Sequence, residues 1–220
     1  MSRYHRGMAL TLYYGSGSPF SWRVLFALEH KGLAYEPRLL SFSKGEHRTL
    51  EYTLINPRRR LPAITDDDFC LYESNAITEY LEDRFPQPTL FPGDARARAR
   101  VRRQREEADA YIGAPYQTLV QQLFFKKQEQ RDRGPILDAR SRLASELEML
   151  ERQVEEPFLV GELSAADFAL YPFLIMFSRF ALKEPELHLP SLIGPRIHAW
   201  MKRIEALPYY EKTYPPHWRS

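Results

Sequence analysis

Arg60-Leu61-Pro62-Ala63-Ile64, followed after a short hairpin by Tyr72-Glu73-Ser74-Asn75-Ala76-Ile77, is the most informative stretch of this sequence. Proline cannot donate to a strand ladder and keeps the residue before it extended, so Leu61 can offer its backbone to an added peptide. The first N–H groups of a helix lack partners and attract carboxylates, which predicts an anion site near Ser74. Glu73, beside that helix end, can hold an ammonium group. The two stretches together predict a site for a small peptide-like ligand that carries a carboxylate and an amine.

The residues before this region predict a strand, a helix and a second strand. Leu10 to Tyr14 is rich in branched and aromatic residues, as strands are, and a Gly-Ser-Gly sequence ends it. Ser18 suits a helix N-cap and Pro19 the first helical position, and the helix continues to His30. Residues 35–40 predict a second strand, which should be parallel to the first because a helix connects them.

The region around the acidic turn predicts a hairpin and a helix. Ala63 to Thr65 pairs with Phe69 to Tyr72, and a helix runs from Asn75 to about Arg84. The order βαβ and then ββα describes an α/β domain over residues 8–84. Residues 85–93 contain three prolines, which oppose both helix and ladder and therefore predict a linker.

The sequence after the linker is predicted to be helical. Asp94 suits the cap of a first long helix, and Ser164-Ala165-Ala166-Asp167 is a variant capping box with aspartate at its last position. The expected helices cover about residues 94–111, 116–131, 135–155, 168–179 and 195–207. The predicted fold class is therefore α/β plus all-α, with an all-helical C-terminal domain over residues 94–220.

Composition argues against several classes of protein. The chain has 220 residues and a formal net charge of +2, which disfavours a dedicated nucleic-acid binder. Its longest apolar run, residues 168–177, is too short to span a bilayer, and residues 1–7 lack the apolar segment of a secretory signal. The single cysteine, Cys70, fits a reducing cytoplasm, and its strand pattern predicts a buried, inert side chain. The histidines lack metal-ligand spacing, so we expect no metal, no membrane and no nucleic-acid partner.

An arginine-rich stretch from Arg96 to Arg105 is open to a nucleic-acid interpretation. Alternate residues on a helix spread around its circumference, however, and do not form one stripe. Arg102 and Arg103 also stand four residues before Glu106 and Glu107, at the spacing of helical ion pairs. A solvated helix is therefore the favoured interpretation.

Several motifs of this chain occur together in one known family. They are Ser18-Pro19-Phe20 with Arg23-Val24, Asn56-Pro57 before Leu61-Pro62, Glu73-Ser74, Phe158-Leu159-Val160-Gly161, and the Ser164 to Asp167 box with Phe168-Ala169-Leu170. Their order and spacing resemble the cytosolic glutathione transferases over nearly the whole chain, especially the serine-type tau, zeta and theta classes and bacterial members. The resemblance implies a thioredoxin-like N-terminal domain, an all-helical C-terminal domain, a cytoplasmic homodimer and a role in detoxification.

The resemblance also implies how glutathione is held. The Leu61-Pro62 bond would be cis, and the Leu61 backbone would pair with the cysteinyl part of glutathione. Glu73 and Ser74 would take the γ-glutamyl amine and carboxylate. The glycyl carboxylate needs a cation, and the candidates are Arg60, Arg48 and His47.

The sequence departs from the family's usual pattern at two places. Arg58-Arg59-Arg60 replaces the common glycine–lysine pair before the hydrophobic residue and proline. The segment between Gly161 and Ser164 is also one residue short. The first departure affects the glycyl contact, and the second alters only a loop.

Ser18 matches the active-site serine of the serine-type classes. Glutathione must become a thiolate to attack an electrophile, and lowering a thiol pKa of about 8.5 by about two units takes about 2.7 kcal/mol. A hydroxyl donor supplies about 1.5–3 kcal/mol and a helix N-terminus about 0.3–2 kcal/mol, so one serine suffices without a metal. Spacing alone leaves Ser18 as a plain N-cap. The other donors that remain open are Ser16, Ser21, Tyr13 and Tyr14.

We therefore expect a glutathione transferase that conjugates glutathione, its cosubstrate, to a small hydrophobic electrophile. The candidate walls of the electrophile pocket are Tyr14, Tyr111, Tyr116, Phe124 and Phe125, although core packing explains aromatic residues in helices equally well. One alternative is another glutathione-dependent reaction, such as isomerisation, dehalogenation or ether cleavage, and a second is a non-enzymatic module with the transferase fold. The Ser18-Pro19-Phe20 run differs from the Ser-Ser-Cys-like run of zeta-type isomerases, which disfavours that activity.

Overall fold

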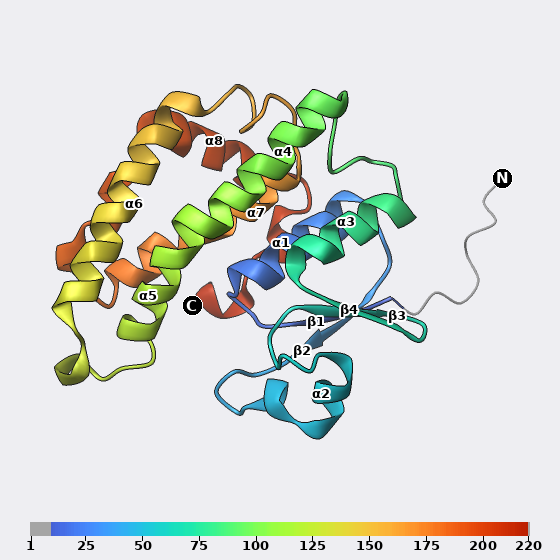
Figure 1. Ribbon diagram of the computed structural model, residues 1–220, viewed down its shortest axis with the longest axis horizontal. Coiled ribbons are helices and arrows are strands. Elements are labelled where there is room, and N and C mark those ends of the chain that lie inside the picture. Colours follow the sequence, from blue (N-terminus) through green and yellow to red (C-terminus); the bar gives the residue numbers. More distant parts are fainter. Residues whose placement is uncertain (1–9, 220) are drawn as a thin grey trace. The chain divides into compact units, whose positions relative to one another are not determined.

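The computed structural model describes residues 10–219, which form two units (Figure 1). The first unit comprises the chain up to Leu90 together with the segment from Pro208 onward, and the second comprises Phe91–Leu207. The sequence pattern places the C-terminal segment with the helical domain, whereas its contacts lie in the first unit. The reason is Trp22, whose indole N–H donates to the Thr213 hydroxyl at 2.9 Å and whose ring packs against Tyr214.

A mixed sheet lies at the centre of the first unit. Its strands, in the spatial order β2-β1-β3-β4, are β1 Thr11–Tyr14, β2 Glu36–Leu39, β3 Ala63–Asp66 and β4 Phe69–Tyr72. β1 is parallel to β2 and antiparallel to β3, and β3 and β4 form a hairpin, which confirms the predicted βαβ and ββ order. The predicted burial of Cys70 is wrong, because β4 is an edge strand and leaves that side chain exposed.

Helices cover both faces of this sheet (Figure 1). The helical segments are α1 Pro19–His30, η1 Glu46–Arg48, α2 Leu50–Ile55, α3 Ser74–Arg84, α9 Tyr210–Thr213 and η6 Pro216–Trp218. α1 and α3 pack against each other, while Tyr52 of α2 lies in a separate buried cluster with Leu61 and Ala63. The expected thioredoxin-like arrangement is therefore present, with α1 and α3 on one face and α2 on the other.

A buried ion pair fixes the end of α3 and the proline-rich segment that follows it. Lys31 Nζ lies 2.9 Å from Glu82 and also donates to the carbonyls of Phe85 and Pro88. The Glu82 carboxylate accepts from the Leu90 N–H at 2.8 Å. Burial opposes ionisation of Glu82, but the bonds from Leu90, Thr89 and Lys31 outweigh it and hold the pKa of this carboxyl below its ordinary value of 4.5.

We expect Glu82 to contribute to the pH dependence of stability. Because its pKa is lower in the folded state than in the unfolded chain, its contribution is present above pH 4.5 and is lost as the pH falls through the folded-state value. Glu82→Gln should therefore flatten the loss of unfolding free energy on acidification, as measured by urea titration at several pH values. An acid limb identical to that of the parent protein would contradict this assignment.

The second unit is predominantly helical, as predicted. Its segments are α4 Ala95–Glu107, η2 Ala108–Gly113, α5 Ala114–Leu123, η3 Gln128–Gln130, α6 Arg133–Gln153, α7 Ala165–Ala181, η4 Pro185–Leu187, η5 Leu189–Leu192 and α8 Pro195–Glu205. The capping box before α7 is present. α5 ends earlier than predicted, because Arg131 donates to the Leu123 carbonyl and Asp132 caps α6. Within residues 10–219, every helix is too short or too polar to cross a membrane.

Candidate active site

The register of the sheet brings three of the predicted site segments to the same end. Tyr13 lies opposite Ala63, and Ala63 lies opposite Tyr72 on its other side. The residues that adjoin this row at the same end of the sheet are therefore Tyr14 and Glu73, which follow β1 and β4, and Pro62, which precedes β3. Because α1 follows β1 and α3 follows β4, both helices begin at this end of the sheet, and their positive N-termini converge there.

Leu61 keeps its backbone available at this end. The Leu61-Pro62 bond is cis, as the family resemblance implies. The register begins at Ala63, so the Leu61 N–H and C=O face no ladder partner among residues 10–219. The preceding carbonyl, of Arg60, is held firmly because it accepts from the Tyr52 hydroxyl at 2.6 Å and from Asn56 Nδ2 at 2.7 Å. An extended peptide can therefore pair with Leu61 against a fixed support.

Glu73 and Ser74 form the entry to α3. Glu73 is exposed and has a φ of 69°, a left-handed conformation that is strained for glutamate and that clusters at ligand sites. Ser74 is buried, and its hydroxyl lies 3.4 Å from Arg23 Nη1, which also donates to Asn75 Oδ1 at 3.0 Å. Arg23 thus ties α1 to the start of α3. Its signals in the sequence are its place in the Ser18-Pro19-Phe20 and Arg23-Val24 motif and its position in an otherwise apolar stretch of helix.

The three serines around the start of α1 have different contacts in the structure. Ser21 is buried and its hydroxyl accepts from the Gly15 N–H at 3.1 Å. The Ser16 hydroxyl lies 2.9 Å from His217 Nδ1. Ser18 caps α1, with its oxygen accepting from the Ser21 N–H at 3.4 Å. Ser18 is partly exposed, whereas Ser21 is fully buried and Ser16 pairs with His217, so the Ser18 hydroxyl can donate to a ligand at the positive end of α1.

Comparison with known proteins agrees with this geometry. Residues 8–83 match the glutathione S-transferase N-terminal domain, and residues 94–203 match the glutathione S-transferase C-terminal domain. Glutathione S-transferase A of Pleuronectes platessa is 30% identical over 216 residues, which cover 95% of this chain and 92% of that protein. The chain belongs to the glutathione S-transferase family. It is a glutathione transferase with a thioredoxin-like domain followed by a helical domain.

Two further relatives bear on what this transferase binds and does. A glutathione transferase of Burkholderia graminis, solved with two glutathione molecules bound per subunit, is 27% identical with a TM-score of 0.81, covering 93% of this chain and 87% of that one. Maleylacetoacetate isomerase of Pseudomonas aeruginosa is 47% identical over 98 residues, covering 43% of this chain and 45% of that protein. The chain is therefore similar both to a glutathione-bound transferase and, over part of its length, to an isomerase.

The transferase has several basic groups near its predicted glycyl site. Arg48, Arg60 and the neighbouring Arg58 are exposed. His47 lies in η1, where its ring packs edge-on against Phe42 at 5.3 Å between centroids. Burial, and then the charge of Arg48, hold the pKa of His47 below its ordinary value. His47 is consequently neutral at pH 7, and the exposed arginines are the better cations for a carboxylate.

The aromatic candidates for the electrophile pocket divide into two groups. Tyr116 is buried in the second unit, where its ring packs 5.0 Å from Phe173 and 5.5 Å from Phe180. Burial raises the pKa of Tyr116 well above its ordinary range. This contact set favours the core-packing alternative for Tyr116. Tyr111 and Phe125, in contrast, are largely exposed.

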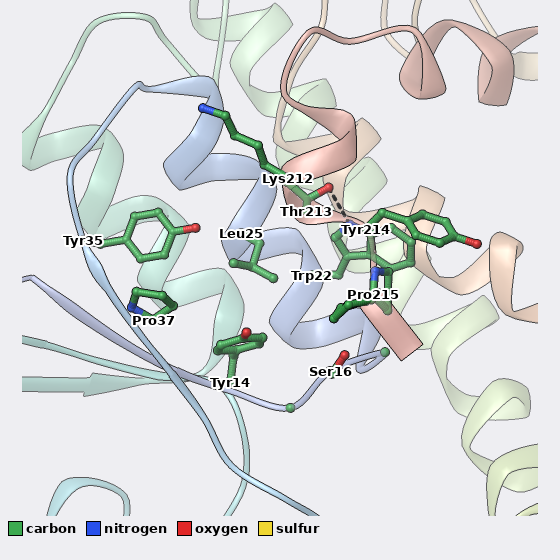
Figure 2. A pocket seen from close by; sticks show the side chains of 13 residues that line it. Tyr14, Ser16, Trp22, Leu25, Tyr35, Pro37, Lys212, Thr213, Tyr214 and Pro215 are labelled. Carbon is green, nitrogen blue, oxygen red and sulfur yellow. Dashed lines mark hydrogen bonds between the residues drawn. The ribbon is translucent and has the colours of Figure 1, made fainter. Parts of the chain in front are cut away.

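A cavity of about 140 Å³ lies beside the β1–α1 connection (Figure 2). Its walls are Tyr14, Gly15, Ser16, Gly17, Trp22, Leu25, Tyr35 and Pro37, and the C-terminal residues 212–216. Tyr14 faces this cavity, and burial raises the pKa of its hydroxyl, which makes it a poorer proton donor. The cavity lacks Leu61, Glu73 and Ser74, so it is distinct from the candidate peptide site at the strand ends. Among residues 10–219, no cluster of three metal-ligating side chains occurs.

Proposed function

We propose that this transferase conjugates the thiolate of glutathione to a small hydrophobic electrophile, with Ser18 as the thiolate-stabilising residue. The observation that carries the proposal is the pattern of serine contacts before α1. Ser21 is fully buried and Ser16 pairs with His217, whereas Ser18 is partly exposed at the helix end. Within residues 10–219, the only hydrogen bond of the Ser18 hydroxyl is accepted from the Ser21 N–H. The glutathione-bound relative supports glutathione as the cosubstrate.

In the proposed binding mode, each part of glutathione contacts a different group of the candidate site residues. The cysteinyl backbone of glutathione pairs with Leu61 beside Pro62, which sets the thiol near the start of α1. The γ-glutamyl carboxylate takes the N-terminus of α3 and the Ser74 hydroxyl, and its ammonium takes Glu73. The glycyl carboxylate lies toward the exposed cations Arg48 and Arg60, with a neutral His47 able to donate one N–H.

The chemistry needs little beyond this placement. A hydroxyl donating to the thiolate supplies about 1.5–3 kcal/mol, and the N-terminus of α1 supplies about 0.3–2 kcal/mol. The sum covers the roughly 2.7 kcal/mol that a two-unit fall of the thiol pKa requires. The thiolate then attacks an electrophilic carbon, while the group it displaces leaves with the bonding electrons. Holding both reactants together supplies much of the remaining acceleration.

Glu73 provides a test of the binding mode that is separate from catalysis. Glu73→Gln removes the charge that pairs with the ammonium and keeps the size of the side chain. We expect KM for glutathione to rise about 10-fold with kcat little changed, because this interaction is equally strong in ground and transition states. Glu51→Gln, an exposed glutamate on α2, is the matched control. An unchanged KM for Glu73→Gln would place the γ-glutamyl group elsewhere.

The second candidate function is glutathione-dependent isomerisation, and the local similarity to maleylacetoacetate isomerase favours it. The two reactions differ in the fate of glutathione, which conjugation consumes and isomerisation returns. Mass balance of free glutathione during turnover therefore separates them. Full recovery of glutathione with an altered substrate would replace conjugation by isomerisation, with the same residues holding the thiolate.

We also propose that the transferase works as a homodimer in the cytoplasm. Both properties are usual for its family, and the exposed single cysteine fits a reducing compartment. Light scattering coupled to size-exclusion chromatography tests the dimer, with twice the monomer mass of 25.9 kDa as the expected result.

A further inference from the structure

The C-terminal segment of the first unit, residues 208–219, lies across α1, and we call it the C-terminal strap. Its anchor is the indole of Trp22, which donates to Thr213 at 2.9 Å in a buried hydrogen bond. The Trp22 ring also meets Tyr214 and Trp218 edge-on, at 5.8 Å and 5.5 Å between centroids. These contacts fix the course of the strap over the first turns of α1.

The far end of the strap reaches the turn that leads into Ser18. The Ser18 N–H donates to the Gly15 carbonyl at 3.1 Å, and Gly17 has a φ of 79°, so residues 15–18 form a β-turn with glycine at the position that needs a positive φ. The strap contacts both central residues of this turn. His217 Nδ1 lies 2.9 Å from the Ser16 hydroxyl, and a Cβ added to Gly17 would lie only 3.0 Å from the Trp218 ring.

The strap does not hold this turn by continuous packing. Residues 212–216 of the strap, which include the anchor Thr213, form one wall of the cavity of about 140 Å³ (Figure 2). The opposite walls include Tyr14 and the backbone of the turn itself. With open space on that side, the position of the turn depends on a few defined contacts. Two are internal bonds, from the Gly15 N–H to Ser21 and from the Ser18 N–H to the Gly15 carbonyl. The others come from the Phe42 ring beside Gly15 and from His217 and Trp218.

We propose that His217 is a positioning residue for catalysis, because its hydrogen bond to Ser16 holds the turn that sets the Ser18 hydroxyl at the N-terminus of α1. This proposal rests on the proposed function of Ser18. His217 acts through Ser16 and touches no reacting atom. The hydrogen bond between His217 and Ser16 is exposed to solvent, where a hydrogen bond adds little to stability. Its proposed role is therefore to place the Ser18 hydroxyl.

The test compares variants that remove or keep the hydrogen bond. His217→Leu and Ser16→Ala each remove it, whereas His217→Asn keeps an acceptor near the position of Nδ1. The readouts are kcat, KM for glutathione, and the pKa of the bound thiol from its thiolate absorbance. We expect His217→Leu to raise the thiol pKa and to lower kcat about 3- to 10-fold while leaving KM nearly unchanged. His217→Asn should restore both quantities, and the double variant Ser16→Ala/His217→Leu should be no worse than either single one.

Two controls distinguish the positioning role of His217 from a general effect of changes in the strap and from the role of Ser18 itself. Arg219→Ala removes an ion pair with Glu211 inside the strap, away from the turn, and should leave the thiol pKa and kcat unchanged. Ser18→Ala, assayed in parallel, reports on the proposed function itself. If Ser18→Ala lowers kcat strongly while His217→Leu keeps the parent thiol pKa and kcat, the positioning role is overturned. If His217→Leu loses thermal stability and His217→Asn fails to restore the thiol pKa, the role is structural and the proposal also falls. If Ser18→Ala has no effect, both proposals fail together.

Discussion

Replacing Ser18 by alanine should lower kcat about 10- to 150-fold, the loss expected when a charge-assisted hydrogen bond of about 1.5–3 kcal/mol to the thiolate disappears. The pKa of bound glutathione should rise toward that of the free thiol. The affinity for glutathione should change little, because the proposed contacts of the peptide with Leu61, Glu73 and Ser74 are kept. The measurements are steady-state kinetics, thiolate absorbance against pH, and the thermal shift produced by glutathione.

This variant needs a control for the loss of a helix cap. Ser18 also accepts from the Ser21 N–H, so alanine removes about 1 kcal/mol of capping as well as the donor. Asp94→Ala removes the cap of α4, where Asp94 accepts from the N–H groups of Arg96 and Ala97, and should lower stability by a similar amount without affecting the thiol pKa. Turnover of Ser18→Ala equal to that of the parent would remove Ser18 from the mechanism.

Replacing Asp167 by alanine should lower the free energy of unfolding by about 3–5 kcal/mol, because it leaves several buried donors unsatisfied at about 1–3 kcal/mol each. Asp167 is fully buried in the second unit. Its carboxylate accepts from Trp200 Nε1 at 2.7 Å, from the Leu159 N–H at 3.0 Å, and from the Ser164 N–H at 2.8 Å. Alanine would leave these donors buried without an acceptor. Urea unfolding monitored by fluorescence measures the change.

Two further variants test whether the loss of unfolding free energy comes from the broken hydrogen-bond network or from the loss of a charge. Asp138→Ala removes an exposed aspartate from α6 and should change stability by less than about 0.5 kcal/mol. Asp167→Asn keeps the shape of the side chain, but its amide NH2 group would face N–H groups that now donate to the carboxylate. This variant should therefore also be strongly destabilising. A loss below about 1 kcal/mol in Asp167→Ala would show that the capping-box network contributes little to stability.

Asp167 should also affect how the free energy of unfolding depends on pH. Burial, opposed by the hydrogen bonds, raises the pKa of Asp167 from 3.8 to about 6. Because the folded-state pKa is the higher one, the contribution of Asp167 is fully present below pH 3.8 and decreases as the pH rises through about 6. The stability difference between the parent protein and Asp167→Asn should therefore narrow between pH 4 and pH 7, as followed by unfolding titrations in that range. A difference that widens with pH would contradict this direction.

The local elements of the fold could be predicted from the sequence. Ser18 and Pro19 mark the start of α1, the Ser164–Asp167 box marks the start of α7, and the hairpin around Asp67 follows from alternating strands and a turn. Each of these signals acts over a few residues, through backbone hydrogen bonds and allowed dihedral angles. The pairing of Leu61-Pro62 with Glu73-Ser74 at one end of the sheet also follows, since antiparallel neighbours share an end.

Other features depend on contacts between distant parts of the chain, and only the tertiary structure decided them. Arg23 reaches the start of α3, and Trp22 draws the C-terminal strap onto α1, although neither partner is near in sequence. The exposure of Cys70 depends on β4 being an edge strand, and the burial of Tyr116 depends on its packing against α7. Local sequence patterns predict the backbone conformation and the possible bonds of a residue. Its burial and its side-chain partners depend on which elements pack together. For this transferase, the sequence alone predicted a peptide clamp and several candidate serines, and the tertiary structure decided how buried each serine is and which partners it has, because those depend on contacts between distant segments.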